Sequence, residues 1–444
     1  MRIFSFLIKK AVRPRFIHIT LLICQLFFVN NNLSQKIIAG PIQGETTDSS
    51  VTFWILVKNV TDLSIIDNNS MVKFNQVLIK EDSIVNKYYK KLKAFKYTIT
   101  FSHHGSSSLH YGLMLNNEIS FNYNFTVLTK NNSFLFGSCA YIGKGFSKGY
   151  RPWNMTKIYK NMAKENADYM IWMGDNLYLT LNHDLKNKFS IYRRYLGVRK
   201  DKDLNVFLSS NIPHYSTWDD HDFGPNNSDG SFKNSTLTTN AFLNFWPNPN
   251  PVNDKGIYYS FRKGDAEFFM TDSRTFRNNN GSSLLGLKQL DWLKKELLSS
   301  TATFKFIIIS NQVINQVKGH ESYYDFPNER NTLFNFIKEN KIPGILFLSG
   351  DRHHSEVQVE DLNYPYPIYD VTCSALSSPR PKFRGWGPEG DLKERMPGSF
   401  ITKHNYGKCI IQGENEDKKL LFTYYNYRMK EIFTFSIHMK ELGY

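Results

Sequence analysis

Residues 344–353 read GILFLSGDRH, an apolar run of strand length that ends in a polar group. Such a run predicts a buried strand, with Asp351 and His353 in the loop that follows it. Polar side chains follow other short apolar or aromatic runs in the same way: Cys139 after 134–136, Asp175 and Tyr178 after 168–173, Asp220 and His221 after Trp218, and Asn311 after 304–309. In an open α/β sheet, groups that follow the strands meet at the carboxyl edge, where ligands bind. The sequence therefore predicts one site built from separate segments of the chain.

The stretch from residue 131 to residue 444 alternates between strand-like runs and helical patterns. Helical spacing covers residues 155–166, 287–298 and 331–340. This alternation predicts an α/β core in which helices cover sheets. After residue 365 the runs again resemble strands, and the Asn- and Pro-rich stretch 225–255 predicts a long loop near the site.

Residues 36–130 have a different texture. Short alternating runs such as 50–55, 97–101 and 121–125 are separated by polar turns, and no long helical pattern intervenes. This pattern is typical of a small all-β sandwich of the immunoglobulin or fibronectin kind. We therefore expect an N-terminal β-sandwich domain at 36–130 and a larger α/β domain at 131–444.

The first 35 residues have the pattern of a secretory signal. A basic start precedes the apolar stretch 16–29, which is too short and too interrupted, by His18 and Gln25, to span a bilayer. We expect an exported protein, periplasmic or extracellular. An uncleaved signal that anchors the chain in the membrane is the alternative. No later segment is long and apolar enough for a span, so no stable membrane span is expected after signal removal.

The chain is basic. It carries 55 Lys and Arg against 40 Asp and Glu, a formal net charge of +15. A basic surface attracts phosphorylated anions, but it suits nucleic acids and anionic envelope polymers equally well. The sequence contains no aromatic-interleaved basic stripe and no nucleic-acid motif, so we expect no specific nucleic-acid module.

Once the signal is removed, the cysteines that remain are Cys139, Cys373 and Cys409. An odd number excludes a fully paired framework, and the pairing of Cys373 with Cys409 stays open. Cys139 is either an inert buried thiol or a thiolate that binds a metal ion. Its place at the end of the first α/β strand, ahead of a glycine-rich loop, favours the metal as much as the inert thiol.

The other polar groups mix hard oxygen donors with histidine and tyrosine, the makeup of a two-metal hydrolase site. Asp175 could bridge two cations or cap a helix. Tyr178 could bind the same ion as a phenolate or be a buried structural tyrosine. Asn311 offers its amide oxygen to a hard ion or forms a turn.

The run Asp219–Asp222 is a dense ionisable cluster, which costs repulsion unless cations offset it. A solvated acidic turn is the alternative. We expect Asp220 to bind metal and His221 to protonate a departing alkoxide, because imidazole exchanges protons near neutral pH. Arg274 and Arg352 could hold phosphate oxygens in a fork, with surface salt bridges as the alternative.

Together these motifs resemble the metallophosphoesterase superfamily, and more closely the alkaline phosphatase D-like family. Gly174–Tyr178 resembles a G-D-x-x-Y element, Asp219–Asp222 resembles G-N-H-[DE], and Gly350–His353 resembles G-H-x-H. The chain departs from the wide superfamily in ways that the D-like family shares: Asp220 in the place of Asn, Asn311 in the place of a lone His, Asp351 in the place of the first His of G-H-x-H, and Gly137–Cys139 in the place of D-x-H. Segments 272–274 and 285–293 also resemble that family. The resemblance is strong over 130–360 and weaker over the N-terminal stretch.

The resemblance implies a metallophosphoesterase-like αββα sandwich core, with residues 131–444 as the catalytic domain, and a site that holds iron and calcium. Thiolate and phenolate suit Fe³⁺, bound by Cys139, Asp175, Tyr178 and His353. Oxygen donors alone suit Ca²⁺, with Mg²⁺ or Mn²⁺ also suited, bound by Asp175, Asp220, Asn311 and Asp351. A water activated by the ions would attack phosphorus in line, and His221 would protonate the leaving group.

The sequence thus predicts an exported, metal-dependent phosphoester hydrolase of the alkaline phosphatase D-like kind, with His221, Arg274 and Arg352 as catalytic residues. Its expected substrates are small-molecule or polymeric phosphoesters, and we expect a monomer. One alternative is a strict phosphodiesterase or phospholipase-like hydrolase of lipid or envelope polymer. The other is an envelope protein without activity that binds anionic polymers through its β domain.

Overall fold

The computed structural model describes residues 35–68, 73–102, 108–126, 132–143, 155–179, 183–317, 321–361, 366–379 and 392–444. The predicted signal at 1–35 lies outside these residues except for Gln35. Among the helices that the structure describes, none combines the length and the apolar composition that a membrane crossing requires.

The N-terminal stretch folds into two small antiparallel sheets, with the strand orders β1-β2-β5-β4 and β3-β6-β7. Their bounds are β1 Lys36–Thr46, β2 Ser50–Lys58, β3 Leu63–Asp67, β4 Phe74–Glu81, β5 Leu92–Phe101, β6 Ser108–Leu115 and β7 Glu118–Thr126, with the short helix α2 Ser83–Tyr88 before β5. Apolar and aromatic residues of both sheets form one core, in which the hydroxyls of Tyr97 and Tyr111 lie 2.8 Å apart. The domain limits and the immunoglobulin-like topology stay predictions.

The rest of the chain contains two six-stranded sheets, with the orders β10-β9-β8-β17-β18-β19 and β11-β12-β13-β14-β16-β15. The first is built from β8 Ser133–Gly137, β9 Tyr169–Met173, β10 His214–Thr217, β17 Asn405–Gln412, β18 Lys419–Asn426 and β19 Glu431–His438. The second is built from β11 Tyr259–Lys263, β12 Ala266–Met270, β13 Phe304–Ile308, β14 Ile345–Ser349, β15 Glu356–Glu360 and β16 Ile368–Thr372. Neighbouring strands are parallel from β8 to β10 and along β12, β13, β14 and β16.

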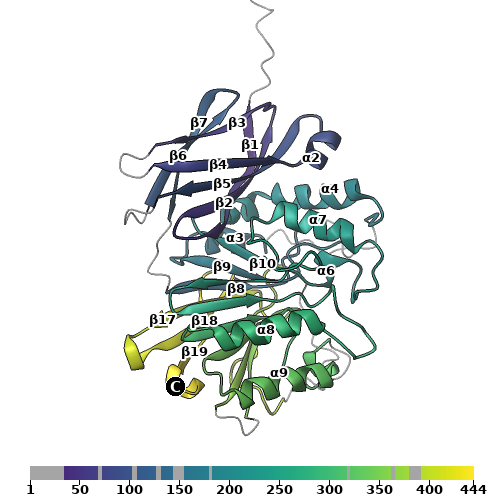
Figure 1. The fold of residues 1–444 in the computed structure, drawn as a ribbon, viewed down its shortest axis with the longest axis vertical. Coiled ribbons are helices and arrows are strands. Elements are labelled where there is room, and N and C mark those ends of the chain that lie inside the picture. The colour runs from purple at the N-terminus through teal and green to yellow at the C-terminus, as the bar shows by residue number, and fades with distance from the viewer. Residues whose placement is uncertain are drawn as a thin grey trace, which may run out of the picture.

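An aromatic core joins these two sheets. The ring of Phe134 on β8 lies 5.2 Å from that of Phe268 on β12 and 5.3 Å from that of Phe306 on β13, between centroids. Helices cover the outer faces, α8 and α9 on one side and α3, α4 and α7 on the side of the N-terminal sheets (Figure 1). The helical elements are α3 Lys157–Met162, α4 Lys188–Arg199, α5 Lys202–Leu208, α6 Asp220–Phe223, α7 Ser235–Phe245, α8 Leu287–Ser299 and α9 Pro327–Glu339, with 3-10 turns at Tyr323–Asp325, Asn415–Asp417 and Met439–Leu442. The predicted α/β class is confirmed.

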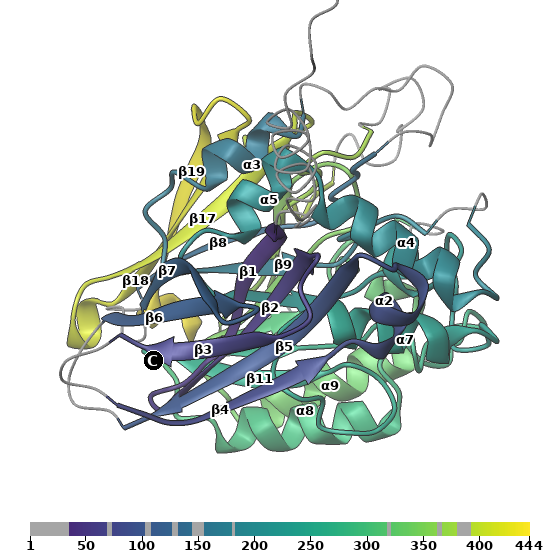
Figure 2. The ribbon, with the colours of Figure 1, turned by 90° about the horizontal axis from the view of Figure 1, so that it is seen from above.

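The N-terminal sheets rest on the helix layer, and the view from above shows their strands in front of it (Figure 2). Trp54 on β2 packs against Phe245 on α7 with ring centroids 5.3 Å apart. The backbone N–H of Glu45 donates to the carbonyl of Pro247 at 2.7 Å. A single apolar cluster therefore runs from the first small sheet into the helices.

Two expectations from the sequence need correction. The stretch 225–255 is not one long loop, because it contains α7, whose buried Ala241, Phe242 and Phe245 recur at helical spacing. Polar and proline residues on both sides obscured this pattern in the sequence. The helix expected at 155–166 is shorter, spanning only Lys157–Met162. Cys373 and Cys409 are both free and buried, so the pairing left open does not form.

Glu329 on α9 is expected to be a large contributor to stability. Its carboxylate accepts hydrogen bonds from the backbone N–H groups of Leu284, Leu285 and Gly286, immediately before α8, and from the hydroxyl of Ser283. A negative charge at this helix end also complements the helix dipole. Glu329→Ala leaves buried donors without a partner and should lower the free energy of unfolding by about 3 kcal/mol. Urea denaturation measures this loss, with Glu339→Ala at an exposed position of the same helix as the control. Equal losses of unfolding free energy in the two variants would contradict the stabilising role of Glu329.

Candidate metal centre

The predicted site residues lie in loops that leave neighbouring strand ends. Cys139 follows β8, Asp175 follows β9, Asp220 follows β10, Asn311 follows β13, and Asp351 and His353 follow β14. Backbone hydrogen bonds join these loops, from Cys139 N–H to the Gly174 carbonyl at 3.2 Å and from Gly350 N–H to the Ser310 carbonyl at 2.9 Å. A side chain at position 350 would lie 2.6 Å from the Ser138 hydroxyl, so glycine lets the loops of the two sheets approach. The site therefore forms where the ends of both sheets meet.

Four of these residues have left-handed backbone conformations. The φ angles are 59° at Cys139, 53° at Asp175, 63° at Asp351 and 58° at His353. Outside glycine, such conformations cost on the order of 1–3 kcal/mol each and persist where the surrounding structure enforces them, as it does at functional sites. Four such conformations in one place indicate that the surrounding structure holds these residues in strained conformations and thereby orients their side chains.

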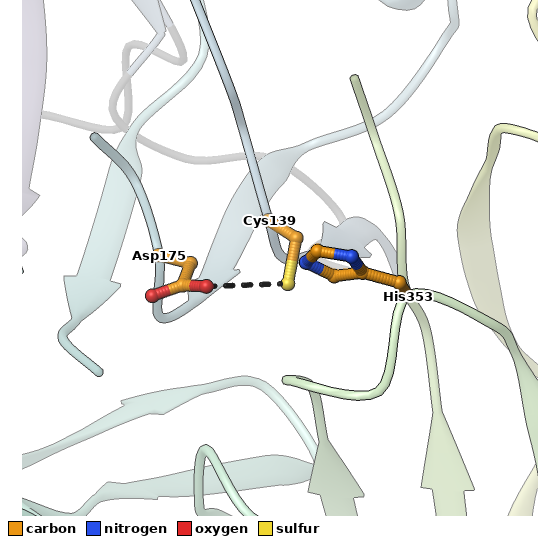
Figure 3. Close-up of side chains that lie close together, drawn as sticks. All are labelled: Cys139, Asp175 and His353. Carbon is orange, nitrogen blue, oxygen red and sulfur yellow. Dashed lines mark hydrogen bonds between the residues drawn. The ribbon is translucent and has the colours of Figure 1, made fainter. Parts of the chain in front are cut away.

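Cys139, Asp175 and His353 form one group of donors, with one candidate ligand atom from each within 4.8 Å of the others. Figure 3 shows Cys139 between the other two, with its Sγ 3.6 Å from Asp175 Oδ2. Tyr178 joins this group, because its hydroxyl lies 3.2 Å from Nε2 of His353. The structure thus brings together the four residues expected around iron.

Asp175, Asp220 and His221 form a second group within 4.8 Å, so Asp175 belongs to both. The other carboxylate oxygen of Asp175, Oδ1, accepts the backbone N–H of His221 at 3.3 Å. Asp220 accepts the N–H of Asn227 through Oδ2 at 2.6 Å, and its Oδ1 has no hydrogen-bond partner among the described residues. The ring of His221 packs on that of Tyr178 with centroids 4.3 Å apart. A carboxylate shared in this way can bridge two cations.

Asn311 and Asp351 are the other oxygen donors expected for the second ion. Their loops follow β13 and β14, which pair in parallel. Asn311 is fully buried, yet neither its Oδ1 nor its Nδ2 has a hydrogen-bond partner within the described part of the chain. An unsatisfied buried amide costs about 1–3 kcal/mol, so its retention here points to a ligand that the protein atoms do not supply.

The site concentrates negative charge in a buried place. Burial raises the pKa of Asp175 well above its usual range, and the charges of Asp220 and Asp219 raise it further. Burial likewise raises the pKa of Asp351, with a further contribution from Asp219. Burial and the charge of Asp175 raise the pKa of the Cys139 thiol. Carboxylates and a thiol gathered this way repel one another unless cations offset the charge.

His353 carries no charge in these surroundings. Burial lowers its pKa to about 4, and the nearby His221 adds to the effect. A neutral imidazole keeps a lone pair for a metal ion. The donor set, the unpartnered amide of Asn311 and the unpartnered oxygen of Asp220 all fit a site for two cations.

The two arginines that were expected to hold phosphate oxygens lie in different surroundings. Arg274 is fully buried, and its guanidinium donates to Asp219 at 2.6 Å, to both carboxylate oxygens of Glu321, and to the Ser228 carbonyl. These partners occupy all of its nitrogens and favour a positioning role. Arg352 is nearly buried, with its Nη1 3.8 Å from Asp351 Oδ2. Phosphate binding by either arginine stays a prediction.

Three acidic residues with structural contacts to the site were not assigned a role from the sequence. Asp222 accepts the backbone N–H groups of Asn176 and Leu177 at 3.1 and 3.2 Å and thereby ties two motif loops together. Asp219 accepts Arg274 and the Ser310 hydroxyl, the latter at 2.8 Å. The spacing of Asp219 and Asp222 is that of a capping box, which was the available signal. Glu321 lies outside every motif, and no sequence signal marks it.

Three comparisons agree on the kind of protein to which this chain is similar. A model of the PhoD-like phosphatase family matches residues 134–384. Alkaline phosphatase D of Bacillus subtilis (strain 168) is 27% identical over 281 residues, which cover 50% of this chain and 46% of that protein. The chain therefore aligns with about half the length of this curated relative. A solved structure titled "Structure of PhoD" has a TM-score of 0.62 at 17% identity and covers 90% of this chain and 92% of that one, a likeness of fold. Because the family model spans more than half of the chain, this protein belongs to the PhoD-like phosphatase family.

Proposed function

We propose that this protein is a metal-dependent phosphoester hydrolase whose two cations are held by the loops described above. The observation that carries the proposal is the sharing of Asp175 between two groups of donor atoms, each gathered within 4.8 Å. Membership in the PhoD-like phosphatase family supports the same chemistry. An envelope protein without activity would have no need of strained loops that present a thiol, carboxylates and imidazoles to one point.

The donor types favour different metals at the two positions. Cys139, Tyr178 and His353 offer sulfur, phenol and imidazole beside Asp175, a set that suits Fe³⁺. Asp220, Asn311 and Asp351 offer oxygen beside Asp175, a set that suits Ca²⁺, with Mg²⁺ or Mn²⁺ also suited. When bound, such cations supply an activated water and neutralise charge on the phosphoryl oxygens.

The protein groups then have distinct tasks. His221, next to both Asp175 and Asp220, acts as the general acid that gives its proton to the departing oxygen. Asp222 and Asp219 hold the loops in position. Asp222 accepts the backbone N–H of Asn176, and Asp219 accepts the guanidinium of Arg274. Arg352 lies beside Asp351, and we propose that its guanidinium binds a phosphate oxygen.

The finer points of the prediction belong to the same proposal. We infer a metallophosphoesterase-type sandwich for the two large sheets at 131–444 and an immunoglobulin-like sandwich for 36–130. We also propose export, a monomeric state, and a small-molecule or polymeric phosphoester as substrate.

The test is hydrolysis of p-nitrophenyl phosphate and bis(p-nitrophenyl) phosphate by protein of measured iron and calcium content. We expect turnover of at least one ester, because two-metal sites serve both phosphatases and nucleases. Chelation should abolish this turnover, and adding metal back should restore it. Preference for the diester alone would favour the strict phosphodiesterase. Metal-free protein with full turnover, or metal-loaded protein that hydrolyses neither ester, would overturn the proposal.

A further inference from the structure

Next to two loops of the candidate metal centre lies a buried carboxylate that no motif includes. Glu356 opens β15, is fully buried, and accepts four side-chain hydrogen bonds. The donors are Gln312 Nε2 at 2.6 Å, Arg395 Nε at 2.5 Å, His354 Nε2 at 3.1 Å and Gln358 Nε2 at 3.2 Å. Although burial alone would raise it, hydrogen bonds and charges from His354 and Arg395 lower the pKa of Glu356 to about 2. Glu356 is therefore an ionised carboxylate, called the hub below, and both of its oxygens accept hydrogen bonds.

Two of these donors are the immediate chain neighbours of expected metal ligands. Gln312 follows Asn311 in the loop after β13, and His354 follows His353 in the loop after β14. One carboxylate oxygen, Oε1, accepts from both Gln312 and His354. Glu356 thus joins the two loops through the neighbours of two expected ligands.

The Gln312 side chain is held at both ends. Its Nε2 also donates to the Thr372 hydroxyl at 2.9 Å, and its Oε1 accepts Asn315 Nδ2 at 2.7 Å. Asn311 itself has no side-chain hydrogen bond within the described part of the chain, so its orientation depends on its backbone and its packing. Gln312, which Glu356 holds, is the next residue along that backbone.

The other loop depends on the hub in a similar way. His353 sits at a φ of 58° and donates its backbone N–H to the Ser374 hydroxyl at 3.0 Å. Its neighbour His354 is fixed between Glu356 and the ring of Phe400, whose centroid lies 4.9 Å away. Arg395 covers the hub, with its guanidinium 4.1 Å from the same Phe400 ring. These contacts resist relaxation of a strained ligand loop.

We propose that Glu356 is a positioning residue of the metal centre, which holds Asn311 and His353 in place for the ions through Gln312 and His354. The proposal rests on the proposed function, since it assumes that these two residues bind metal. Partners of metal ligands commonly change metal affinity by about 10- to 100-fold when they are removed. Glu356 acts one residue further from the ligand, along the backbone.

The test compares Glu356→Gln with Glu360→Gln in full-length protein. Glu360 lies on the same strand and is also buried, and it pairs with Arg330. Both variants lose a buried, ion-paired carboxylate, so both should lower the melting temperature. Only Glu356→Gln should weaken Mn²⁺ binding to chelator-treated protein, by about 10-fold or more in equilibrium dialysis. Its loss of ester hydrolysis should also be reversed by excess Mn²⁺, which general structural damage would not allow.

A second variant keeps the test decisive if Glu356→Gln does not fold. Gln312→Leu removes the link to the Asn311 loop at similar volume and should weaken Mn²⁺ binding in the same way. Unchanged Mn²⁺ affinity in the variant that folds, with wild-type protein binding Mn²⁺ and hydrolysing the nitrophenyl esters, would overturn the positioning role alone. Wild-type protein that neither binds metal nor hydrolyses either ester would overturn the proposed function and, with it, this inference.

Discussion

Asp175→Asn is expected to lower kcat/KM for a nitrophenyl phosphoester by at least about 10³-fold. Asp175 is the one residue that belongs to both groups of donor atoms, and its two oxygens face different neighbours, Cys139 Sγ and the His221 N–H. If this carboxylate bridges two cations, its loss weakens the binding of both at once. Cations in such sites contribute several kcal/mol of charge stabilisation, and each 1.36 kcal/mol corresponds to a factor of ten in rate. Steady-state kinetics with metal analysis of the same samples measures the effect.

The matched control is Asp203→Asn. Asp203 is also buried, but it accepts the Thr156 hydroxyl at 2.9 Å and pairs with Lys160, within the helix layer. This variant should keep its metal content and its rate while losing some stability. If Asp175→Asn retained full metal content and a rate within tenfold of the wild type, the proposal that Asp175 bridges two cations would be wrong.

The second large effect is expected from His221→Ala, and it should depend on the leaving group. A general acid typically accelerates the reaction by about 10²–10⁴-fold where the departing oxygen needs a proton. An alkyl phosphoester releases a basic alkoxide and should lose a factor in that range, whereas nitrophenolate leaves without protonation and should lose much less. Rates of an alkyl and a nitrophenyl ester, measured on the same preparations, give the comparison.

Metal analysis of His221→Ala separates two roles for this residue. Its ring lies within 4.8 Å of oxygens of Asp175 and Asp220, a place that also suits a metal ligand. Equal loss on both esters, together with a missing ion, would assign His221 to metal binding instead of proton transfer. Equal loss with both ions in place would leave the acid role without support.

Much of the candidate site could be predicted because its information is local. Each expected ligand comes within a few residues of the end of an apolar run, and an apolar run of strand length ends at the edge of a sheet by its own geometry. Asp175 after β9 and Asp351 after β14 needed only that rule to be placed at one edge. Their side-chain chemistry was legible from residue type alone.

Helix α7 shows where the local reading was insufficient. Its polar and proline-rich flanks resemble a loop. The helix is stabilised when Phe242 and Phe245 are buried in the helix layer, where Phe245 also packs against Trp54. Tertiary packing supplied the stabilisation that the segment's own propensities did not.

The amino-acid sequence by itself determined the order of the motif loops, the donor atoms that they offer and the α/β class of the chain, because strand periodicity and ligand chemistry are properties of neighbouring residues. Only the tertiary structure decided which groups support those donors. Arg274 meets Glu321, 47 residues away, and Glu356 meets Gln312, 44 residues away. Such partners are chosen by the packing of whole sheets and loops, since a buried charge takes whichever complementary group the folded chain brings within reach.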